Sequence, residues 1–388
     1  MKNLGESFCS GSVPIGIYIH IPFCLSKCAY CDFLSSENAS TQTQENYVKA
    51  LTEEIRTARK GILAGAVIDT IYVGGGTPTA LHSFLLCVVL QEARGLATGS
   101  QMDDIEFTVE ANPGTLNSSY LSALRSCGVN RLSLGLQAWQ DHLLRAIERA
   151  HTSDDFLSTF LTARDIGFDN MNIDIMFSLP GQTLAHLRET LADVIALSPE
   201  HISAYSLTPA EDTPLWSWLE GGQIRLPDER ADREMYHEAN QLLTDAGYIH
   251  YELSNFAKPS RESRHNVNCW RRRPYIGFGL GAHSFDGKSR WHNETNMAAY
   301  LHNPHTFVGI EALSEADAMA EMMFLGLRLS EGISDNDFFR VFGVKLTDRY
   351  GTQIKKLIKD GLLAREADRL FLTSYGADLA NRVFQAFI

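Results

Sequence analysis

The sequence predicts an α/β protein, with a partial (β/α) barrel followed by a small α+β domain. Between residues 15 and 208, short apolar runs alternate with helical periodicity, the pattern of repeated βα units around a parallel sheet. Each apolar run is followed by glycine or polar residues, as expected where barrel strands end at the face that carries the site. A doubly wound sheet is the alternative, and it would place these strand ends along a crevice.

Six runs are predicted as the strands of this sheet. In chain order they are residues 16–21, 69–73, 105–109, 131–136, 171–177 and 201–207. A helical pattern over 44–64 follows the first strand, a second over 227–247 comes after the last, and 248–257 reads as a further strand. The pattern then changes to the helices 315–329, 335–342, 347–360 and 375–387, with two short strands within 362–373. This last part predicts a winged-helix-like module.

The chain of 388 residues therefore divides into four parts. Residues 1–14 are an N-terminal tail, and 15–290 form the barrel with its C-terminal extension. Residues 291–312 are interpreted as a linker because asparagine and proline recur there, and 313–388 form the C-terminal domain.

Composition and net charge argue against two classes of protein, transmembrane proteins and nucleic-acid-binding proteins. A hydrophobic content of 44% is ordinary for a globular chain, and no run of 18 apolar residues or signal-peptide core appears. The protein is thus expected in the cytoplasm and not as a transmembrane protein. Lys and Arg number 34 against 47 Asp and Glu, a net charge of −13, which disfavours nucleic acid as a partner.

Three of the seven cysteines, Cys24, Cys28 and Cys31, follow the first predicted strand with CxxxCxxC spacing. A disulfide would leave one thiol over, and structural zinc would need a fourth ligand from Asp32 or His20. Clusters of the 4Fe–4S type normally take four thiolates, so three suggest a cluster with one iron open to an exchangeable ligand. We favour this cluster over a zinc site and over three unligated thiols.

Polar residues close several other strands. Gly74–Gly76 alone is a tight turn or a ligand cradle, and Glu110 or Asp174 alone could simply be satisfied at a strand end. Their placement after successive strands instead favours one shared site at the barrel mouth.

The segment from Lys258 to Arg273 carries six basic residues and one acidic residue. It is either a solvated loop or a set of arginines that meets an anionic ligand, since guanidinium groups pair carboxylates in bidentate fashion. Within it, His265 is either a metal ligand or an ordinary hydrogen-bonded histidine.

These motifs together resemble the radical S-adenosylmethionine (SAM) superfamily, and within it the coproporphyrinogen III dehydrogenase-like proteins HemN and HemW. The resemblance spans about residues 15–388 and rests on YIHIPFCLSKCAYCDF, GGGTPT, EANPGT, RLSLGLQAW, NIDIMFSLPGQT, YELSNFA, RHNVNCW and GLGAHS. It implies a partial (β/α)6 barrel in which Cys24, Cys28 and Cys31 hold a 4Fe–4S cluster and SAM chelates the open iron. The implied contacts to one or two SAM molecules are Tyr18, Tyr30, Gly75, Gly76, Thr77, Glu110, Gln137, Arg149, Asp174 and Ser206.

Two departures indicate the HemW type within this family. The dehydrogenases carry a further cysteine two residues after the third ligand, where this chain has Phe33, and only 23 residues precede Cys24. HemW-type proteins are thought to bind haem through an HNxxYW motif and pass it to acceptors. Here the motif runs from His265 to Trp270 with Cys269 in place of tyrosine, so His265 is the expected haem contact. Cys269 is either an axial thiolate or a packing replacement for the ring.

The resemblance thus implies a haem chaperone that binds SAM and a 4Fe–4S cluster, with the arginines of the 261–273 segment meeting haem propionates. Its expected partners are haem or another tetrapyrrole, an acceptor protein and an electron donor for the cluster. The alternative is oxygen-independent decarboxylation of coproporphyrinogen III to protoporphyrinogen IX. Radical SAM modification of RNA is a third possibility, which the acidic charge disfavours.

Overall fold

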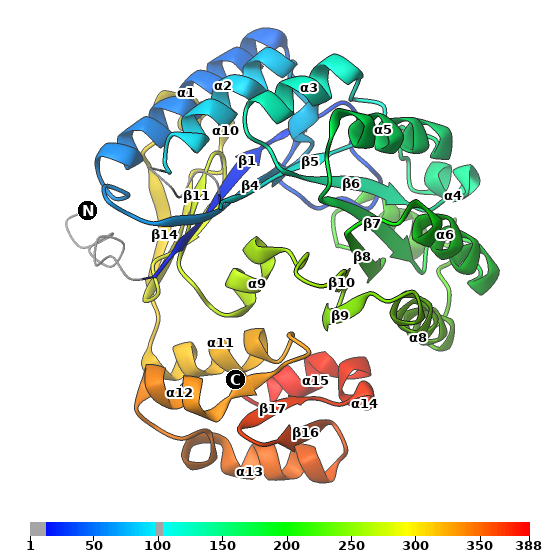
Figure 1. The fold of residues 1–388 in the computed structure, drawn as a ribbon, viewed down its shortest axis with the longest axis vertical. Coiled ribbons are helices and arrows are strands. Elements are labelled where there is room, and N and C mark those ends of the chain that lie inside the picture. Colours follow the sequence, from blue (N-terminus) through cyan, green and yellow to red (C-terminus); the bar gives the residue numbers. More distant parts are fainter. Residues whose placement is uncertain (1–12, 98–103) are drawn as a thin grey trace.

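The computed structural model describes residues 13–97 and 104–388. A curved sheet with helices on its outer face makes up the first part of the chain, and a smaller domain follows below it (Figure 1). In the described part of the chain, no helix has the length and apolar character needed to cross a lipid bilayer.

Six parallel strands form the centre of the sheet and lie side by side in chain order. They are β1 (Ile15–Ile21), β4 (Ile68–Gly75), β5 (Glu106–Ala111), β6 (Arg131–Gln137), β7 (Met171–Phe177) and β8 (His201–Ser206). A doubly wound sheet reverses its strand order at a switch point, and this order contains no reversal. The prediction of a barrel-type sheet is therefore confirmed.

Additional strands extend both edges of this sheet. Beyond β1 lie β11 (Tyr275–Phe278), which is parallel, and then β12 (His283–Phe285), β13 (Ser289–Asn293) and β14 (Phe307–Ala312), which are antiparallel. Beyond β8 lie β10 (Asn255–Ala257) and β9 (Ile249–Glu252), so the predicted strand 248–257 is two strands. Among the described residues the sheet ends at β14 and β9, which leaves the barrel open.

Six helices cover the outer face of the sheet (Figure 1). They are α1 (Thr41–Lys60), α2 (Ser83–Arg94), α3 (Ser118–Ser126), α5 (Ser153–Ile166), α6 (Leu184–Leu197) and α8 (Glu229–Asp245). In α1 the buried residues Tyr47, Leu51 and Ile55 recur every four positions, so one stripe of the helix faces the sheet. α5 begins with a capping box between Thr152 and Asp155, which satisfies donors that the first turn leaves free.

Shorter elements decorate the loops at the strand ends. They are β2 (Phe23–Cys24), β3 (Ser36–Glu37), η1 (Pro78–Ala80), α4 (Asp141–Ala146), α7 (Pro214–Glu220) and α9 (Arg264–Trp270).

The predicted linker, residues 291–312, is instead part of the sheet and its outer layer. It contains most of β13, the helix α10 (Met297–His302) and β14. Trp291 is buried, its ring lies 6.1 Å from that of Phe307, and the Tyr300 hydroxyl donates to the buried Glu54 carboxylate at 2.6 Å. Asn293, one of the residues that suggested a linker, is instead buried in β13 and donates to Glu54 at 2.6 Å.

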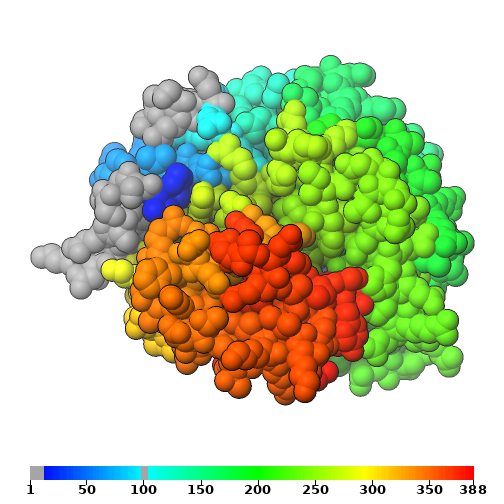
Figure 2. Space-filling view, turned by 60° about the horizontal axis from the view of Figure 1, so that its bottom comes forward, coloured from blue at the N-terminus to red at the C-terminus, as the bar shows by residue number. Residues whose placement is uncertain are grey.

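The C-terminal domain mixes helices and strands around a core of its own. It contains α11 (Glu315–Gly326), β15 (Ile333–Ser334), α12 (Asp335–Phe342), α13 (Leu346–Lys359), β16 (Leu363–Glu366), β17 (Arg369–Leu372), α14 (Ser374–Asp378) and α15 (Ala380–Gln385). The predicted helix 375–387 is thus two short helices. Figure 2 shows this domain as a lobe seated against the barrel, where the Glu321 carboxylate accepts from Arg272 and Arg290 at 2.8 and 2.9 Å.

Candidate functional site

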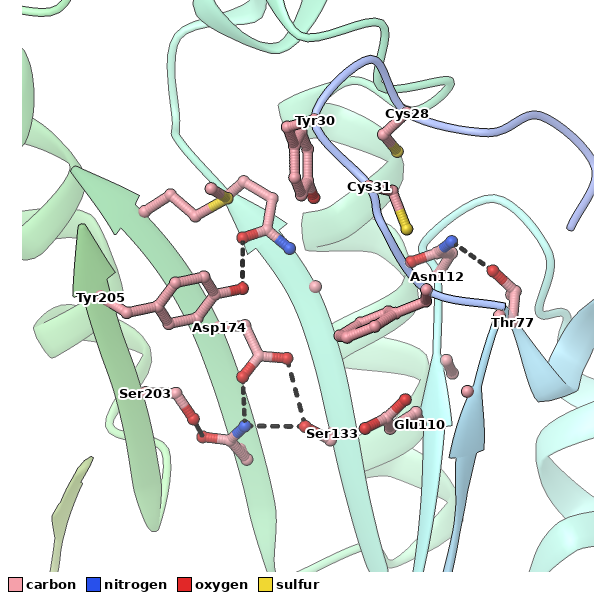
Figure 3. A pocket seen from close by; sticks show the side chains of 18 of the residues that line it. Cys28, Tyr30, Cys31, Thr77, Glu110, Asn112, Ser133, Asp174, Ser203 and Tyr205 are labelled. Atoms are coloured by element: carbon pink, nitrogen blue, oxygen red, sulfur yellow. Dashed lines mark hydrogen bonds between the residues drawn. The ribbon is translucent and has the colours of Figure 1, made fainter. Parts of the chain in front are cut away.

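A cavity of about 520 Å³ lies on the inner side of the parallel sheet, beneath the cysteine loop (Figure 3). Successive side chains of a strand point to opposite faces, so every second residue of β6, β7 and β8 faces this cavity, together with Glu110 of β5. The outward-facing residues between them pack against the helices. Strand alternation and chain-order pairing therefore bring polar side chains from distant parts of the sequence to one space.

The residues predicted to bind the cluster and SAM meet at this cavity with one exception. Cys24, Cys28, Tyr30, Cys31, Gly75, Gly76, Thr77, Glu110, Gln137, Arg149, Asp174 and Ser206 all line it. Tyr18 does not line it, but its ring stacks on that of the lining residue Tyr72 with centroids 6.4 Å apart. The Tyr18 hydroxyl lies 3.0 Å from His20 Nδ1, so Tyr18 supports the wall of the cavity.

The three cysteines lie on one loop at the mouth of the cavity, and Figure 3 shows the side chains of Cys28 and Cys31 near its upper end. Burial raises the pKa of the Cys24 and Cys31 thiols, so binding a metal centre would release protons from them. Among the described residues, no three His, Cys, Asp or Glu side chains are grouped to hold a single ion. In an iron–sulfur cube each thiolate instead binds its own iron, so the thiols need not converge.

Two donors approach these thiols. Arg149 Nη1 donates to Cys28 Sγ at 3.5 Å, and the Thr77 hydroxyl donates to Cys24 Sγ at 3.8 Å. Arg149 is held in place by Gly135 O and Asn112 Oδ1, which accept from its Nη2 at 2.7 and 2.8 Å. A fixed guanidinium beside the thiols suits an anionic centre carried by three thiolates.

The glycine loop after β4 packs directly under the cysteine loop. A Cβ atom on Gly76 would lie 2.8 Å from Phe23 O and 3.0 Å from Cys24 Sγ, and Gly75 adopts a φ of +112°. The N–H groups of Gly76 and Thr77 donate to Ile21 O and Phe23 O at 2.9 and 2.7 Å. These two N–H groups therefore hold the cysteine loop and are not free to donate to a ligand.

Two carboxylates face the cavity from neighbouring parts of the sheet. Burial raises the pKa of Glu110 to about 7, against a hydrogen bond of 2.7 Å from the Tyr72 hydroxyl, which lowers it. Burial also raises the pKa of Asp174, whose carboxylate accepts from Asn172 Nδ2 at 2.8 Å and Ser133 Oγ at 3.2 Å. Figure 3 shows these partners around Asp174. Such groups can accept hydrogen bonds from a polar, cationic ligand.

The two remaining predicted contacts, Gln137 and Ser206, already have hydrogen-bond partners within the protein. Gln137 Oε1 accepts from the Tyr205 hydroxyl at 3.1 Å, and the Ser206 hydroxyl donates to Asp232 on α8. Because Asp232 already occupies the Ser206 hydroxyl, a ligand at Ser206 would have to share that hydrogen bond.

The expected haem contact, His265, is enclosed in the structure. Its side chain lies inside the barrel, only 7% of the residue is exposed, and its Nδ1 lies 2.8 Å from Thr70 Oγ1. Its ring stacks on Tyr72 with centroids 5.1 Å apart, and burial lowers its pKa to about 4. In this arrangement the imidazole is buried and stacked and is not presented to a ligand as large as haem, so His265 as the haem contact stays a prediction.

The basic segment around His265 is also committed to internal partners. Arg264 pairs with Asp69, and Arg271 and Arg272 pair with Glu331 and Glu321, each at 2.8 Å. Lys258 lies 3.6 Å from Glu200. Four of the six basic side chains thus attach this segment to the barrel and to the C-terminal domain, and they are not free to meet propionates.

Several cavity residues were not predicted. They are Tyr72, Asn112, Arg131, Ser133, Asn172, His201, Ser203 and Tyr205. Asn112 and Asn172 stand two positions from Glu110 and Asp174, and Ser133 stands four positions from Gln137, so alternation along the chain could have found these three.

Comparison with known proteins agrees with this arrangement. The model of the radical SAM superfamily matches residues 18–194, and the model of the HemN C-terminal domain matches residues 313–379. The solved structure of coproporphyrinogen III oxidase (HemN) from Escherichia coli, described as a radical SAM enzyme, superimposes with a TM-score of 0.85. It covers 100% of this chain and 93% of its own, at 22% identity, which shows the shared fold. The chain is therefore a radical SAM protein with a HemN-type C-terminal domain.

Curated relatives narrow the family. The protein named heme chaperone HemW from Bacillus subtilis is 37% identical over 376 residues, covering 96% of this chain and 98% of that protein. Its namesakes from Lactococcus lactis and Escherichia coli are 35% and 31% identical, each covering 97% of this chain and 97% and 98% of their own lengths. The chain belongs to the HemW family.

Proposed function

We propose that this protein is a haem chaperone that binds a 4Fe–4S cluster and SAM at the barrel mouth and delivers haem to acceptor proteins in the cytoplasm. The observation that carries the proposal is the similarity, along nearly the whole chain, to proteins named heme chaperone HemW. Phe33 supports it, because this residue stands where the dehydrogenases are expected to carry a further cysteine, and its side chain is exposed.

Membership of the radical SAM superfamily implies the cluster and SAM. In our proposal Cys24, Cys28 and Cys31 ligate three irons, and Arg149 offsets the negative charge beside them. Tyr30, Gly75, Gly76, Thr77, Glu110, Gln137, Asp174 and Ser206 would line the SAM pocket. When bound and reduced by an electron donor, the cluster and SAM together supply radical chemistry.

The haem-binding residues stay open within this proposal. His265 would have to leave Thr70 and Tyr72 before it could reach a haem iron, so we do not assign it as the axial ligand. Burial raises the pKa of Cys269 to about 11, and Arg290 offsets this only in part, which disfavours a ready axial thiolate.

Haem titration of the purified, anaerobically reconstituted protein tests the proposal. We expect saturable binding seen in the Soret absorbance, and we expect His265→Ala to retain it because the imidazole is enclosed. The absence of saturable binding in both proteins would refute the chaperone function. If only His265→Ala fails to bind haem, His265 contributes to the haem site after all.

The rival activity is decarboxylation of coproporphyrinogen III, which the HemN fold by itself does not favour because the shared fold extends to other functions. An anaerobic assay with reductant, SAM and coproporphyrinogen III separates the two. We expect no protoporphyrinogen IX, and its formation would replace the chaperone proposal.

A further inference from the structure

Arg131, the first residue of β6, presents a buried guanidinium to the cavity. The residue is only 2% exposed and lines the cavity wall. Within residues 13–97 and 104–388 it has no ion pair, and its Nε is buried without a hydrogen-bond partner. The other deeply placed arginines differ: Arg149 is fixed by two oxygens, and Arg272 pairs with Glu321.

The groups around Arg131 are already occupied by one another. His201 places Nδ1 2.6 Å from Asn172 Oδ1 and Nε2 2.7 Å from the Tyr251 hydroxyl. The Asn172 amide nitrogen donates to Ser133 and to Asp174 at 2.7 and 2.8 Å. Neither the imidazole nor the amide therefore has a free acceptor to offer to Arg131.

The nearby strand β5 does not supply a partner either. The buried Glu106 carboxylate accepts from the backbone N–H groups of Arg264 and His265 at 2.8 and 3.0 Å, which commits it to the start of α9. Thr108, which pairs with Arg131 across the sheet, has a buried hydroxyl that also lacks a partner. The floor of the cavity thus contains unused hydrogen-bonding groups around one cation.

Leaving a guanidinium in this state is costly. Burying an ion costs several kcal/mol even after relaxation. The charges of Glu110 and Asp174 offset part of this cost, since Arg131 lowers the pKa of both carboxyl groups, but among the described residues neither accepts a hydrogen bond from its guanidinium. The unused donors therefore face the cavity and can donate to an anion that binds there.

We propose that Arg131 binds a carboxylate group of an organic ligand at the floor of the barrel cavity. The planar guanidinium fork matches a carboxylate in bidentate geometry. Glu110 and Asp174 already bring negative charge to the same cavity, so a ligand group with one negative charge is better compensated there than a phosphate dianion.

The position of Arg131 indicates which ligand carries the carboxylate. β6 has seven residues and runs from Arg131 to Gln137, so the two ends lie about 20 Å apart at the usual strand rise. A SAM molecule whose carboxylate chelates the cluster at the mouth would hold that group far from the floor. The favoured source is therefore a propionate of a tetrapyrrole, a step that rests on the proposed function, and a SAM carboxylate is the other source.

The test uses Arg131→Met in the full-length, reconstituted protein. The probes are coproporphyrin III, its tetramethyl ester and SAM, each titrated into wild type and variant. We expect the variant to bind coproporphyrin III about ten- to a hundredfold more weakly, the range for losing charged hydrogen bonds. Binding of the ester and of SAM should not change. If the variant binds only SAM more weakly, Arg131 still binds a carboxylate, and that carboxylate belongs to SAM. If coproporphyrin III and SAM both bind as tightly as to wild type, the proposal is overturned.

Thermal unfolding without ligand gives an independent readout. An unpaired buried charge destabilises the empty protein, so Arg131→Met should be as stable as wild type or more stable. The matched control is Arg164→Met, which removes an arginine paired with Glu200 at 2.8 Å on the outer layer and should lower the Tm. A similar loss of Tm in Arg131→Met would show a structural role and overturn the proposal. Haem titration of the wild-type protein tests the chaperone function by itself. The chaperone function and the carboxylate site at Arg131 can therefore be refuted separately.

Discussion

The barrel mouth and the 258–273 segment both looked like ligand sites in the sequence, and the structure separates them. At the mouth, polar groups from β4 to β8 converge on one cavity while Cys24, Cys28 and Cys31 keep free thiols. In the 258–273 segment, most charged groups are paired with carboxylates from elsewhere in the chain. A repeated topology thus predicts convergence reliably, whereas a local excess of charge says little until its distant partners are known.

The largest effect should come from the thiols of the mouth. We expect any of Cys24→Ala, Cys28→Ala or Cys31→Ala to abolish the cluster after anaerobic reconstitution, because each thiolate would bind a different iron. Iron and sulfide analysis should give about four of each per wild-type chain and none above background in the variants. Cys269→Ala, in the paired segment, is the matched control and should keep the cluster. Retention of iron and sulfide in all three mouth variants would contradict the assignment.

Substitutions that break the ion pairs of the 258–273 segment should instead lower the stability of the protein. Glu321→Ala removes the carboxylate that Arg272 and Arg290 share, so two partly buried guanidinium groups lose their acceptor. We expect a loss of about 3 kcal/mol in the free energy of unfolding, the lower end for breaking a buried pair. Chemical denaturation measures this, with Glu331→Ala as the more exposed control at about 1 kcal/mol or less. Equal losses would show that burial does not distinguish the two pairs.

A methyl group at the mouth should produce a smaller loss of stability together with a loss of function. Gly76→Ala places a Cβ 2.8 Å from Phe23 O, so the glycine and cysteine loops must separate. We expect about 1–3 kcal/mol of destabilisation, the usual cost of overpacking, together with weaker SAM binding. Gly351→Ala, a helical position with open space around it, should be neutral or slightly stabilising. Unchanged SAM affinity in Gly76→Ala would mean that the two loops move apart freely.

Most of the fold could be predicted because its signals are local. Six apolar runs, each followed by polar or glycine residues, predicted the parallel strands in chain order. The cysteine loop was placed at the mouth because it directly follows the first of these strands. The linker prediction was wrong because Tyr300 acquires its role only from Glu54, which lies 246 residues earlier in the chain. No local pattern encodes such a contact.

The candidate site also contains residues that local sequence signals predict and residues that only the packing reveals. Glu110 and Asp174 were predicted from a pattern of polar residues at successive strand ends, although Asp174 lies in the middle of β7. Arg131 stands at a strand start and gave no signal. His265 was expected to face a ligand because of its motif, yet Thr70 and Tyr72 enclose it from β4. Motif membership therefore identified the family, and only the packing showed which side chains face the cavity.

The smallest expected effect is the pH dependence of SAM binding at the barrel mouth. Burial raises the pKa of Glu110 to about 7, with Tyr72 and Arg131 lowering it and Asp174 raising it. SAM is a cation, so it should bind best to the ionised carboxylate, and affinity should rise with pH and level off above 7. The protonated form dominates at pH 6, where binding should be about tenfold weaker than at pH 8.

Glu110→Gln isolates this contribution, because its amide does not titrate. The α-amino group of SAM has a pKa of about 7.7–8.0 in model compounds and must lose a proton to chelate iron, so both proteins should show that part of the pH dependence. Calorimetric titrations between pH 6 and 8 should therefore give a shallower slope for the variant than for wild type. Equal slopes would mean that Glu110 stays protonated or ionised throughout, and the SAM pocket would then have to draw its pH dependence from Asp174, the other carboxylate facing the cavity.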